Sequence, residues 1–435
     1  MLKSVAAMLP PMFVGPLARS AATTMAYRLI NVAIGLAITT ILAKSLGADG
    51  FGIVALGLSI AFMLSMGAKL GLDIYFIRMA PQYIETHKWA LLNGLLYFSA
   101  VLVLILAVSA SALAAMLATA VRADSAIIIA CAIAPLVALN FIAHGILRSI
   151  MQISKAYMPE FIFVQIVVLT GALILASRGA LSPGTALLAY LTGWSLAAAV
   201  SWFWVFKHWP QAARGAARQF NWRAWLGASM LVMVAGLGEF IIGKLEILTL
   251  SAYGSPQALG HYAIALKFAL FATFPVFALS SGFAPTIARL HATADRAAMV
   301  RKIILGARMT LIGATLAAIA ISVGVTVIFP WLGAEFAAAT PLVFILCGGF
   351  VAQASVGRPL DVLLMIGAAR QAAIGSVIST LFLVLIMMTL IPPYGALGAA
   401  ISTAVSFAFH SALLAYFVWK KIGLRCDIFA AANAA

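Results

Sequence analysis

Long apolar stretches separated by short polar segments run through the whole chain. Most are long enough for a helix to cross the roughly 30 Å hydrocarbon core of a bilayer. Twelve can be delimited, at residues 21–43, 51–72, 90–117, 125–147, 161–176, 185–206, 224–250, 260–283, 303–329, 337–356, 373–391 and 395–418. The pattern predicts an all-α polytopic membrane protein with twelve transmembrane helices. The fifth stretch is short, so we expect either that flanking residues extend it or that it lies in a thinned region of the bilayer.

The composition supports the same class. Hydrophobic residues make up 65% of the chain and charged residues 9%, whereas soluble domains contain about 45–50% and about 25%. A water-soluble fold could not bury so much apolar surface. The composition therefore excludes an ordinary soluble enzyme.

Lys and Arg fall almost entirely in every second gap between the apolar stretches. Nineteen of the 27 lie on one side of the predicted membrane, and only Lys44, Arg122 and Arg178 lie on the other. Cationic loops stay in the cytoplasm, so both termini are predicted to be cytoplasmic. The net charge of +16 then reflects topology and attraction to anionic lipid, and it does not indicate nucleic-acid binding.

A faint internal repeat relates residues 46–56 to residues 253–266. In each copy a glycine turn joins two long spans, and a second glycine opens the next helix. Six spans in each half make the repeat parallel, with a pseudo-twofold axis along the membrane normal. We therefore expect two six-helix bundles around a central cavity.

The repeat also sets the expected domain boundaries. The N-terminal bundle covers residues 1–206 and the C-terminal bundle 224–418, and a cytoplasmic tail follows at 419–435. The connecting segment 207–223 is the most basic loop of the chain. We interpret it as a solvated linker held by anionic lipid.

Seven ionisable residues fall inside the predicted spans. A lipid-facing charge at mid-depth costs about 3 kcal/mol, so most of these residues should line an interior, pair, or reach the headgroups. Lys69 and Arg308 are near enough to span ends for their long side chains to reach headgroups. Arg28 is about 10 Å deep, which favours a position facing the cavity. The other four are Lys244, Lys267, Glu239 and Glu246.

The two carboxylates in the seventh span are seven residues apart. On a continuous helix this spacing places Glu239 and Glu246 on one face, with Lys244 pointing about 140° away from Glu239. Lys267 matches Glu246 in depth. Two interpretations remain open for Lys267 and Glu246: a structural ion pair, or a functional coupling site.

No motif indicates a catalytic residue, a metal site or a cofactor. The three cysteines, Cys131, Cys347 and Cys426, lack metal-ligand spacing. Residues 238–244 have the glycine and lysine skeleton of a phosphate-binding loop, but Leu245 replaces the required Ser or Thr and no strand precedes the segment. We expect energy to come from an ion gradient, a substrate gradient or a partner.

Three segments are similar to signatures of a known family. They are ILAKSLGADGFG at 41–52, LEIL at 245–248 followed by LGHY at 259–262, and LIPPYGALGAAIST at 390–403. Together they resemble the polysaccharide-biosynthesis flippases, which export O-antigen and exopolysaccharide lipid-linked sugars. That family belongs to the multidrug/oligosaccharidyl-lipid/polysaccharide exporter superfamily. The second segment departs from the pattern, with Glu246 where Asp is usual.

The resemblance implies a transporter of the bacterial inner membrane, not an enzyme. It would flip an undecaprenyl-pyrophosphate-linked oligosaccharide from the cytoplasmic to the periplasmic leaflet, for cell-surface or exopolysaccharide assembly. The partners implied are the lipid-linked oligosaccharide and membrane lipids. A polysaccharide polymerase and other assembly proteins are candidate partners.

Such a substrate gives roles to the buried charges. Arg28 is our candidate pyrophosphate contact, because a guanidinium is a permanently charged fork that matches phosphate oxygens. Lys244 and Lys267 are candidate secondary contacts. Glu239 and Glu246 are candidates for proton or sodium coupling. Polar and aromatic side chains such as Gln165, Tyr190 and Asn140 would meet the sugar.

Three alternatives remain. A cation-coupled multidrug antiporter of the same superfamily shares the fold, but five intramembrane cations against two anions favour an anionic cargo. A peptidoglycan lipid-precursor flippase would be expected to have two further helices. A membrane polysaccharide polymerase or ligase would be expected to have a large periplasmic loop, and the periplasmic gaps here are short.

Overall fold

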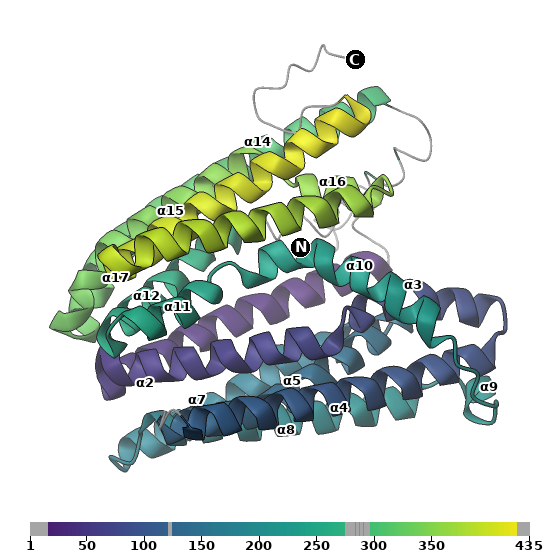
Figure 1. Cartoon of the computed structure of the whole chain (residues 1–435), viewed down its shortest axis with the longest axis horizontal. Coiled ribbons are helices and arrows are strands. Elements are labelled where there is room, and N and C mark those ends of the chain that lie inside the picture. Colours follow the sequence, from purple (N-terminus) through teal and green to yellow (C-terminus); the bar gives the residue numbers. More distant parts are fainter. Residues whose placement is uncertain are drawn as a thin grey trace, which may run out of the picture. The chain divides into compact units, whose positions relative to one another are not determined.

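The computed structural model describes residues 16–120, 124–274 and 296–423, together with Phe283, Ile287 and Leu290. These residues form helices and turns, with no strand among them (Figure 1). Eight helical segments of the described chain are long and apolar enough to cross a membrane. The predicted all-α polytopic membrane fold is confirmed. The predicted layout of twelve spans stays a prediction.

Two of the longest helices each contain two of the predicted spans. Helix α2 (Pro16–Lys69) leaves helical geometry at Gly47, where φ is 67°. Helix α17 (Ala369–Ile422) does so at Gly395, where φ is 53°. Glycine adopts these positive φ angles without steric cost, and other L-residues rarely do. Each glycine is therefore the point at which one span folds back into the next.

The described chain divides into two compact units. Unit 1 holds the described residues up to Ile41 and Leu64–Ser229, and unit 2 holds Leu42–Met63 and the described residues from Met230 onward. The turn of α2 at Gly47 therefore belongs to unit 2.

Unit 1 is a bundle in which α5 packs against α3, α4 and α8 (Figure 1). Its helices after α2 are α3 (Leu72–Glu85), α4 (Trp89–Ala120), α5 (Ser125–Ser149), α6 (Ile153–Met158), the π-helical turn η2 (Pro159–Phe163), α7 (Val164–Ser177), α8 (Pro183–His208), α9 (Gln211–Arg214) and the start of α10 (Trp222–Ile241). The segments α6, η2 and α7 form one span from Ile153 to Ser177. The expected extension of the short fifth stretch is confirmed.

Unit 2 is built around α17, which packs against α11, α12, α15 and α16. Its elements are the end of α10, α11 (Leu245–Tyr253), α12 (Pro256–Ala269), the 3₁₀ turn η3 (Leu270–Thr273), α14 (Arg296–Leu332), the 3₁₀ turn η4 (Ala334–Ala339), α15 (Thr340–Ser355), α16 (Pro359–Met365) and α17.

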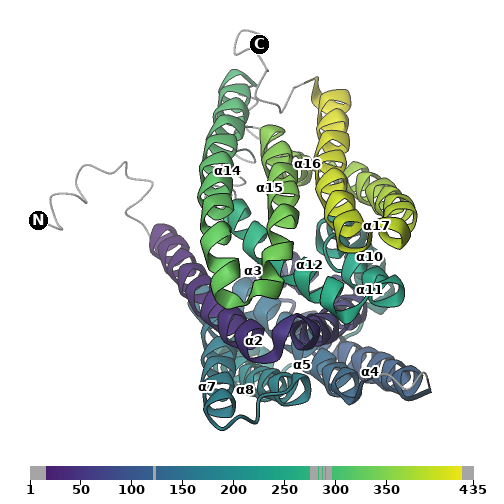
Figure 2. The same ribbon diagram turned by 90° about the vertical axis from the view of Figure 1, so that its left-hand side faces the viewer.

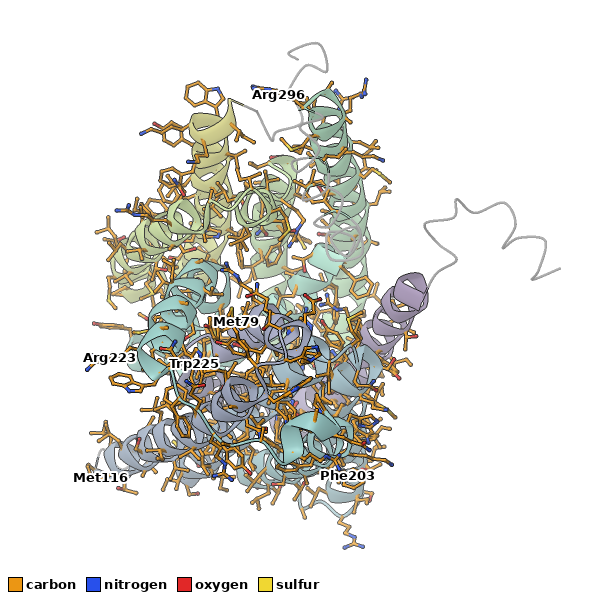
Figure 3. All side chains as sticks on the ribbon, turned by 90° about the vertical axis from the view of Figure 1, so that its right-hand side faces the viewer. Met79, Met116, Phe203, Arg223, Trp225 and Arg296 are labelled. Atoms are coloured by element: carbon orange, nitrogen blue, oxygen red, sulfur yellow. The ribbon has the colours of Figure 1, made fainter. Side chains whose placement is uncertain are left out.

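Helix α14 shows how a span faces lipid. Exposed apolar side chains recur every three or four residues along it, at Leu305, Met309, Ile312, Leu316, Ile319, Val323 and Val327. This stripe is about 33 Å long at 1.5 Å per residue, close to the thickness of a hydrocarbon core. Its opposite face is buried in unit 2. Large apolar side chains are also exposed in unit 1, where Met116 and Phe203 point outward (Figure 3).

The two turns of the sequence repeat meet inside unit 2. A Cβ atom on Gly52 would overlap the backbone of Pro256 and Gly260, and one on Gly260 would overlap the backbone of Ala48. The two glycines thus play the same role in both copies. The Gly47 turn is also fastened by Glu335 of η4, whose carboxylate accepts the Ala48 N–H at 3.1 Å. Figure 2 looks onto this end of unit 2, where α14 ends and α15 begins beside the bend of α2.

Our interpretation of the segment 207–223 as a solvated linker needs correction, because part of the segment is buried. Trp209 and Ala213 are buried in unit 1. The Asn93 amide of α4 donates to the carbonyl oxygens of Ala213 and Ala216, and it accepts the Trp209 indole N–H at 3.0 Å. The linker is thus bound along α4.

The chain after the linker is fixed in the same unit. Trp225 is fully buried, packs against Phe98, and donates its indole N–H to the Tyr83 hydroxyl at 3.1 Å. Figure 3 shows Arg223 pointing away from the ribbon nearby. The basic side chains of the segment stay exposed, as a contact with anionic lipid requires.

Candidate functional sites in the two units

In unit 1 a buried ion pair lies where α2 gives way to α3. The Lys69 ammonium is 2.6 Å from the Asp73 carboxylate, and their side chains are only 9% and 14% exposed. The Lys69 nitrogen also lies 4.8 Å from the centre of the Phe141 ring. Our expectation that Lys69 reaches the headgroups is therefore wrong: the side chain is buried and paired.

Further ionisable groups surround this pair. Arg28 of α2 and Lys69 both act electrostatically on His144 of α5 and on Glu160 of η2. The His144 ring meets the Tyr157 ring edge-on at 4.5 Å. Glu160 stands in a π-helical turn, a distortion that is often found at functional sites.

The groups Arg28, Lys69, Asp73, His144, Arg148 and Glu160 are called the unit 1 cluster below. One oxygen of Asp73 and Nε2 of His144 are buried and have no hydrogen-bond partner among the described residues. Three permanent or nearly permanent cations stand against two carboxyl groups. Such a cluster can stabilise an anionic group that leaves water.

Sequence reasoning selected only Arg28 from this cluster. Asp73 and Glu160 fall in gaps of the hydropathy pattern, so they were not counted among the intramembrane charges. One signal was available, because Lys69 and Asp73 have the four-residue spacing of a helical ion pair. Of the predicted sugar contacts, Asn140 instead accepts the Ser201 hydroxyl at 2.7 Å between α5 and α8.

In unit 2 the helix that contains Glu239 and Glu246 is broken. Helix α10 ends at Ile241 and α11 begins at Leu245, with Gly243 between them at φ 86°. The prediction that the two carboxylates share a helical face is therefore wrong, because it assumed a continuous helix. The backbone of Glu239 lies in α10, and its side chain lies outside the described residues.

Glu246 is fully buried and hydrogen-bonded through both oxygens. It accepts the Gly243 N–H at 2.7 Å, which the helix break makes available. It also accepts the Thr403 hydroxyl of α17 at 2.7 Å. The Tyr262 hydroxyl of α12 lies 2.6 Å from the same Thr403 oxygen. Three helices thus converge on one carboxyl group.

The two predicted lysines of unit 2 are placed differently. Lys244 donates to the Phe240 carbonyl at 3.0 Å, and its ammonium lies 4.3 Å from the centre of the Phe240 ring. Lys267 of α12 is partly buried and makes no ion pair with Glu246. The structural ion pair left open by the sequence is not formed. In the part of the chain that the structure describes, no three His, Cys, Asp or Glu side chains group as metal ligands.

The comparison with protein families decides the affiliation. The family described as "Polysaccharide biosynthesis protein" matches residues 17–291, more than half of the chain. The chain belongs to the polysaccharide biosynthesis protein family. This confirms the resemblance inferred from the three sequence signatures. No curated protein matches the chain.

Solved structures with the same fold as this family member are transporters. A lipid II flippase, MurJ, in an inward closed conformation has a TM-score of 0.68 at 13% identity, over 92% of this chain and 87% of that one. An inward-facing multidrug resistance MATE transporter of the MOP superfamily has 0.64 at 13%, over 93% and 98%. A MOP superfamily transporter from Pyrococcus furiosus has 0.60 at 14%, over 94% and 95%.

These likenesses establish the fold of a MOP superfamily transporter. Together with the family and the apolar helices, they make the chain a multi-pass membrane protein of polysaccharide biosynthesis, with the architecture of flippases and exporters.

Proposed function

We propose that the protein flips an undecaprenyl-pyrophosphate-linked oligosaccharide from the cytoplasmic to the periplasmic leaflet of the bacterial inner membrane. Both termini face the cytoplasm, and an ion gradient drives the step. The glycan serves lipopolysaccharide or exopolysaccharide assembly, with a polymerase among the partners. The observation that carries this proposal is the cation-rich unit 1 cluster inside a fold that is shared with flippases.

The cluster fits the chemistry of a diphosphate headgroup. A diphosphate that enters hydrocarbon needs its charge matched, and Arg28 offers a planar set of donors for its oxygens. Lys69 is held by Asp73 at 2.6 Å and contributes a second positive group nearby. Lys244 and Lys267 of unit 2 are secondary cationic contacts in this proposal. Both lie partly buried on helices of that unit.

The carboxyl groups of unit 2 are the proposed coupling groups. Glu246 combines full burial with hydroxyl partners, so its charge depends strongly on whether a proton or a small cation is bound. Glu239 stays a candidate because it lies seven residues before Glu246, near the end of α10 at Ile241.

The Arg28→Ala variant tests the proposal. We expect periplasmic delivery of the lipid-linked sugar to be lost while the protein stays in the membrane, because removing one partner of a buried charge contact costs about 2–5 kcal/mol. Delivery is measured by enzymatic labelling of periplasmic glycan in cells, and protein by immunoblot of membranes. Arg308→Ala is the matched control, since Arg308 is exposed on α14.

Two outcomes would contradict the proposal. Wild-type delivery by Arg28→Ala would remove Arg28 from the site. The multidrug antiporter would be favoured instead if the protein exported a cationic dye such as ethidium and deletion of its gene left periplasmic glycan unchanged. The antiporter is the second candidate function because a multidrug transporter shares the fold.

A further inference from the structure

The turn at Gly395 divides α17 into a first arm before it and a second arm after it. The second arm has a buried polar stripe. Thr403, Ser406 and His410 follow one another at spacings of three and four residues, which places them on one helical face. Their exposures are 0%, 0% and 1%. The stripe extends about 10 Å along the helix, at 1.5 Å per residue. It starts at the hydroxyl that bonds Glu246.

The first arm of α17 adds a fourth group to this stripe. The two arms run antiparallel (Figure 1), and three contacts fix their register. Gly375 packs against Leu414, Phe382 stacks on Phe409 at 4.0 Å, and Gly398 packs against Leu390. This register places Ser379 at the level of His410. Ser379 is 1% exposed.

The third side of the stripe is helix α10. A Cβ atom on Gly238 would lie 2.8 Å from Cε1 of His410 and 3.3 Å from Cα of Ser376. The Ser376 hydroxyl donates to the Ala235 carbonyl at 2.6 Å, which ties α10 to the first arm. The glycine therefore makes room for the imidazole ring. His410 lies in a seam between three helical segments of unit 2.

The polar atoms buried along the two arms of α17 divide into two groups. Ser376, Ser402 and Thr403 all have hydrogen bonds. By contrast, Ser379 Oγ, Ser406 Oγ and both ring nitrogens of His410 are buried with no partner among the described residues. Unsatisfied polar groups at membrane depth cost several kcal/mol each. Four such atoms gathered in one seam point to a ligand that can donate and accept hydrogen bonds.

Among the described side chains, the seam holds uncharged polar groups around His410. No charged side chain of the described residues acts on the His410 ring. The ionisable groups on the elements that pack against α17 include Glu246 at the start of α11, Lys244 before it, His261, Tyr262 and Lys267 on α12, and Arg358 and Asp361 at the start of α16. Glu239 of α10 follows Gly238 in the sequence, and its side chain lies outside the described residues. Of these, Glu246 and Tyr262 connect to the stripe through Thr403. Glu246 and His410 are thus the two titratable ends of one polar path.

We propose that the seam is a proton-binding site and that protons pass between Glu246 and His410 through the hydroxyls of Thr403, Ser406 and Ser379 and through water bound by them. His410 takes a proton on one ring nitrogen, becomes an imidazolium, and releases the proton from the other nitrogen. Each hydroxyl and water accepts one proton as it donates another. Glu246 alternates between carboxylate and carboxylic acid, and only O–H and N–H bonds change.

This inference rests on the coupling role of Glu246 in the proposed function, and it specifies the ion as a proton. It also explains why a histidine occupies a buried position that an apolar residue would fill at lower cost. A neutral imidazole has one donor and one acceptor nitrogen, so it can relay a proton without a conformational change of the backbone.

Deuterium exchange at the imidazole C2–H tests the site without any transport assay. This exchange needs water and depends on ring protonation, and mass spectrometry resolves it for each histidine of the full-length protein in nanodiscs. We expect His410 to exchange with a sigmoidal dependence on pD, as the exposed His87 does. If His410 stays unexchanged while His87 exchanges, the seam is dry and the proposal is overturned.

Variants of the stripe test the connection. Glu246→Gln should shift the midpoint of the His410 exchange curve, because the carboxyl group at the other end of the hydroxyl path is removed. The shift should disappear in the Ser406→Ala and Ser379→Ala backgrounds. It should persist in Ser402→Ala, the matched control, whose buried hydroxyl bonds only to the Gly398 carbonyl of its own helix at 2.7 Å. A shift that survives Ser406→Ala and Ser379→Ala would overturn the relay and leave a through-space effect.

Cellular delivery of the lipid-linked sugar separates this proposal from the proposed function. We expect Ser406→Ala and Ser379→Ala to slow delivery by about tenfold, equivalent to about 1.4 kcal/mol, with Ser402→Ala unchanged. Normal delivery in both serine variants, with Arg28→Ala inactive, would overturn the relay alone. If His410 exchanges as predicted and Arg28→Ala still delivers the lipid-linked sugar at the wild-type rate, the relay stands and the assigned cargo site is wrong.

Discussion

The two units of this protein bury polar groups in opposite ways. Unit 1 gathers charges of both signs, with Lys69 and Asp73 in contact and Arg28 and Glu160 close by. Among the described side chains of unit 2, the Glu246 carboxyl group is buried among hydroxyls and a backbone N–H. The first arrangement suits a large anion, whose charge must be met by cations. The second suits a proton or a small cation, which needs neutral oxygen partners.

The difference shows how one fold can bind an anionic cargo and a coupling ion at separate sites. A cation-rich site would repel a coupling cation, and a hydroxyl-lined site offers little to a diphosphate. Because each unit has its own polar interior, a substitution in one leaves the hydrogen bonds and ion pairs described in the other in place.

The largest effect on stability is expected from Asp73→Asn. The variant leaves Lys69 buried without its counterion, and breaking such a pair costs about 3–5 kcal/mol. Melting temperature in detergent should fall strongly. The double variant Lys69→Met, Asp73→Leu should recover most of the loss, since a buried ion pair can often be replaced by apolar groups.

The control for this prediction lies in unit 2. Arg358 and Asp361 also form an ion pair, but their side chains are 18% and 19% exposed, and Arg358 has a further interaction. Asp361→Asn should therefore lower the melting temperature less than Asp73→Asn does. An equal or larger loss for Asp361→Asn would contradict the idea that unit 1 concentrates the buried charge.

A smaller effect is expected from Asn93→Ala. The variant removes the donor to the Ala213 and Ala216 carbonyls and the acceptor of the Trp209 indole. Leaving buried groups unsatisfied costs about 1–3 kcal/mol, so segment 207–223 should detach from α4. Trypsin cleavage after Arg214, Arg218 and Arg223 should become faster. Asn221→Ala, at an exposed position, should leave cleavage at the wild-type rate.

The smallest effect on stability is expected from Glu246→Gln. The amide oxygen can accept the Gly243 N–H, and the amide NH₂ can donate to Thr403, whose hydroxyl can rotate. The melting temperature should change by an amount equivalent to less than about 1 kcal/mol, while ion-coupled delivery of the lipid-linked sugar is lost. A loss of stability as large as that of Asp73→Asn would show that Glu246 is structural.

The helices could be predicted from the sequence, and the breaks between them could not. Hydropathy registers whether a segment is apolar, so it located the spans, and even the short fifth stretch was extended as expected. The hydropathy pattern did not predict that α10 ends at Ile241. That break depends on the positive φ of Gly243 and on the capture of its N–H by Glu246, and both follow from tertiary packing.

The candidate sites show the same limit more sharply. Counting charges inside spans found Arg28, Lys244, Lys267 and Glu246, but it missed Asp73 and Glu160, which lie beside the apolar stretches. Charge counting also gave Lys69 the wrong environment. Whether a charge near the end of a span reaches headgroups or turns inward is decided by the neighbouring helices, which the linear pattern does not describe.

The reciprocal fit of Gly52 and Gly260 has a consequence for how this chain can evolve. Each residue leaves space for the other copy's main chain, so enlarging either one forces the opposite turn to move. Tolerated substitutions should then appear as correlated changes at both positions among homologues, as they do for residues in direct contact.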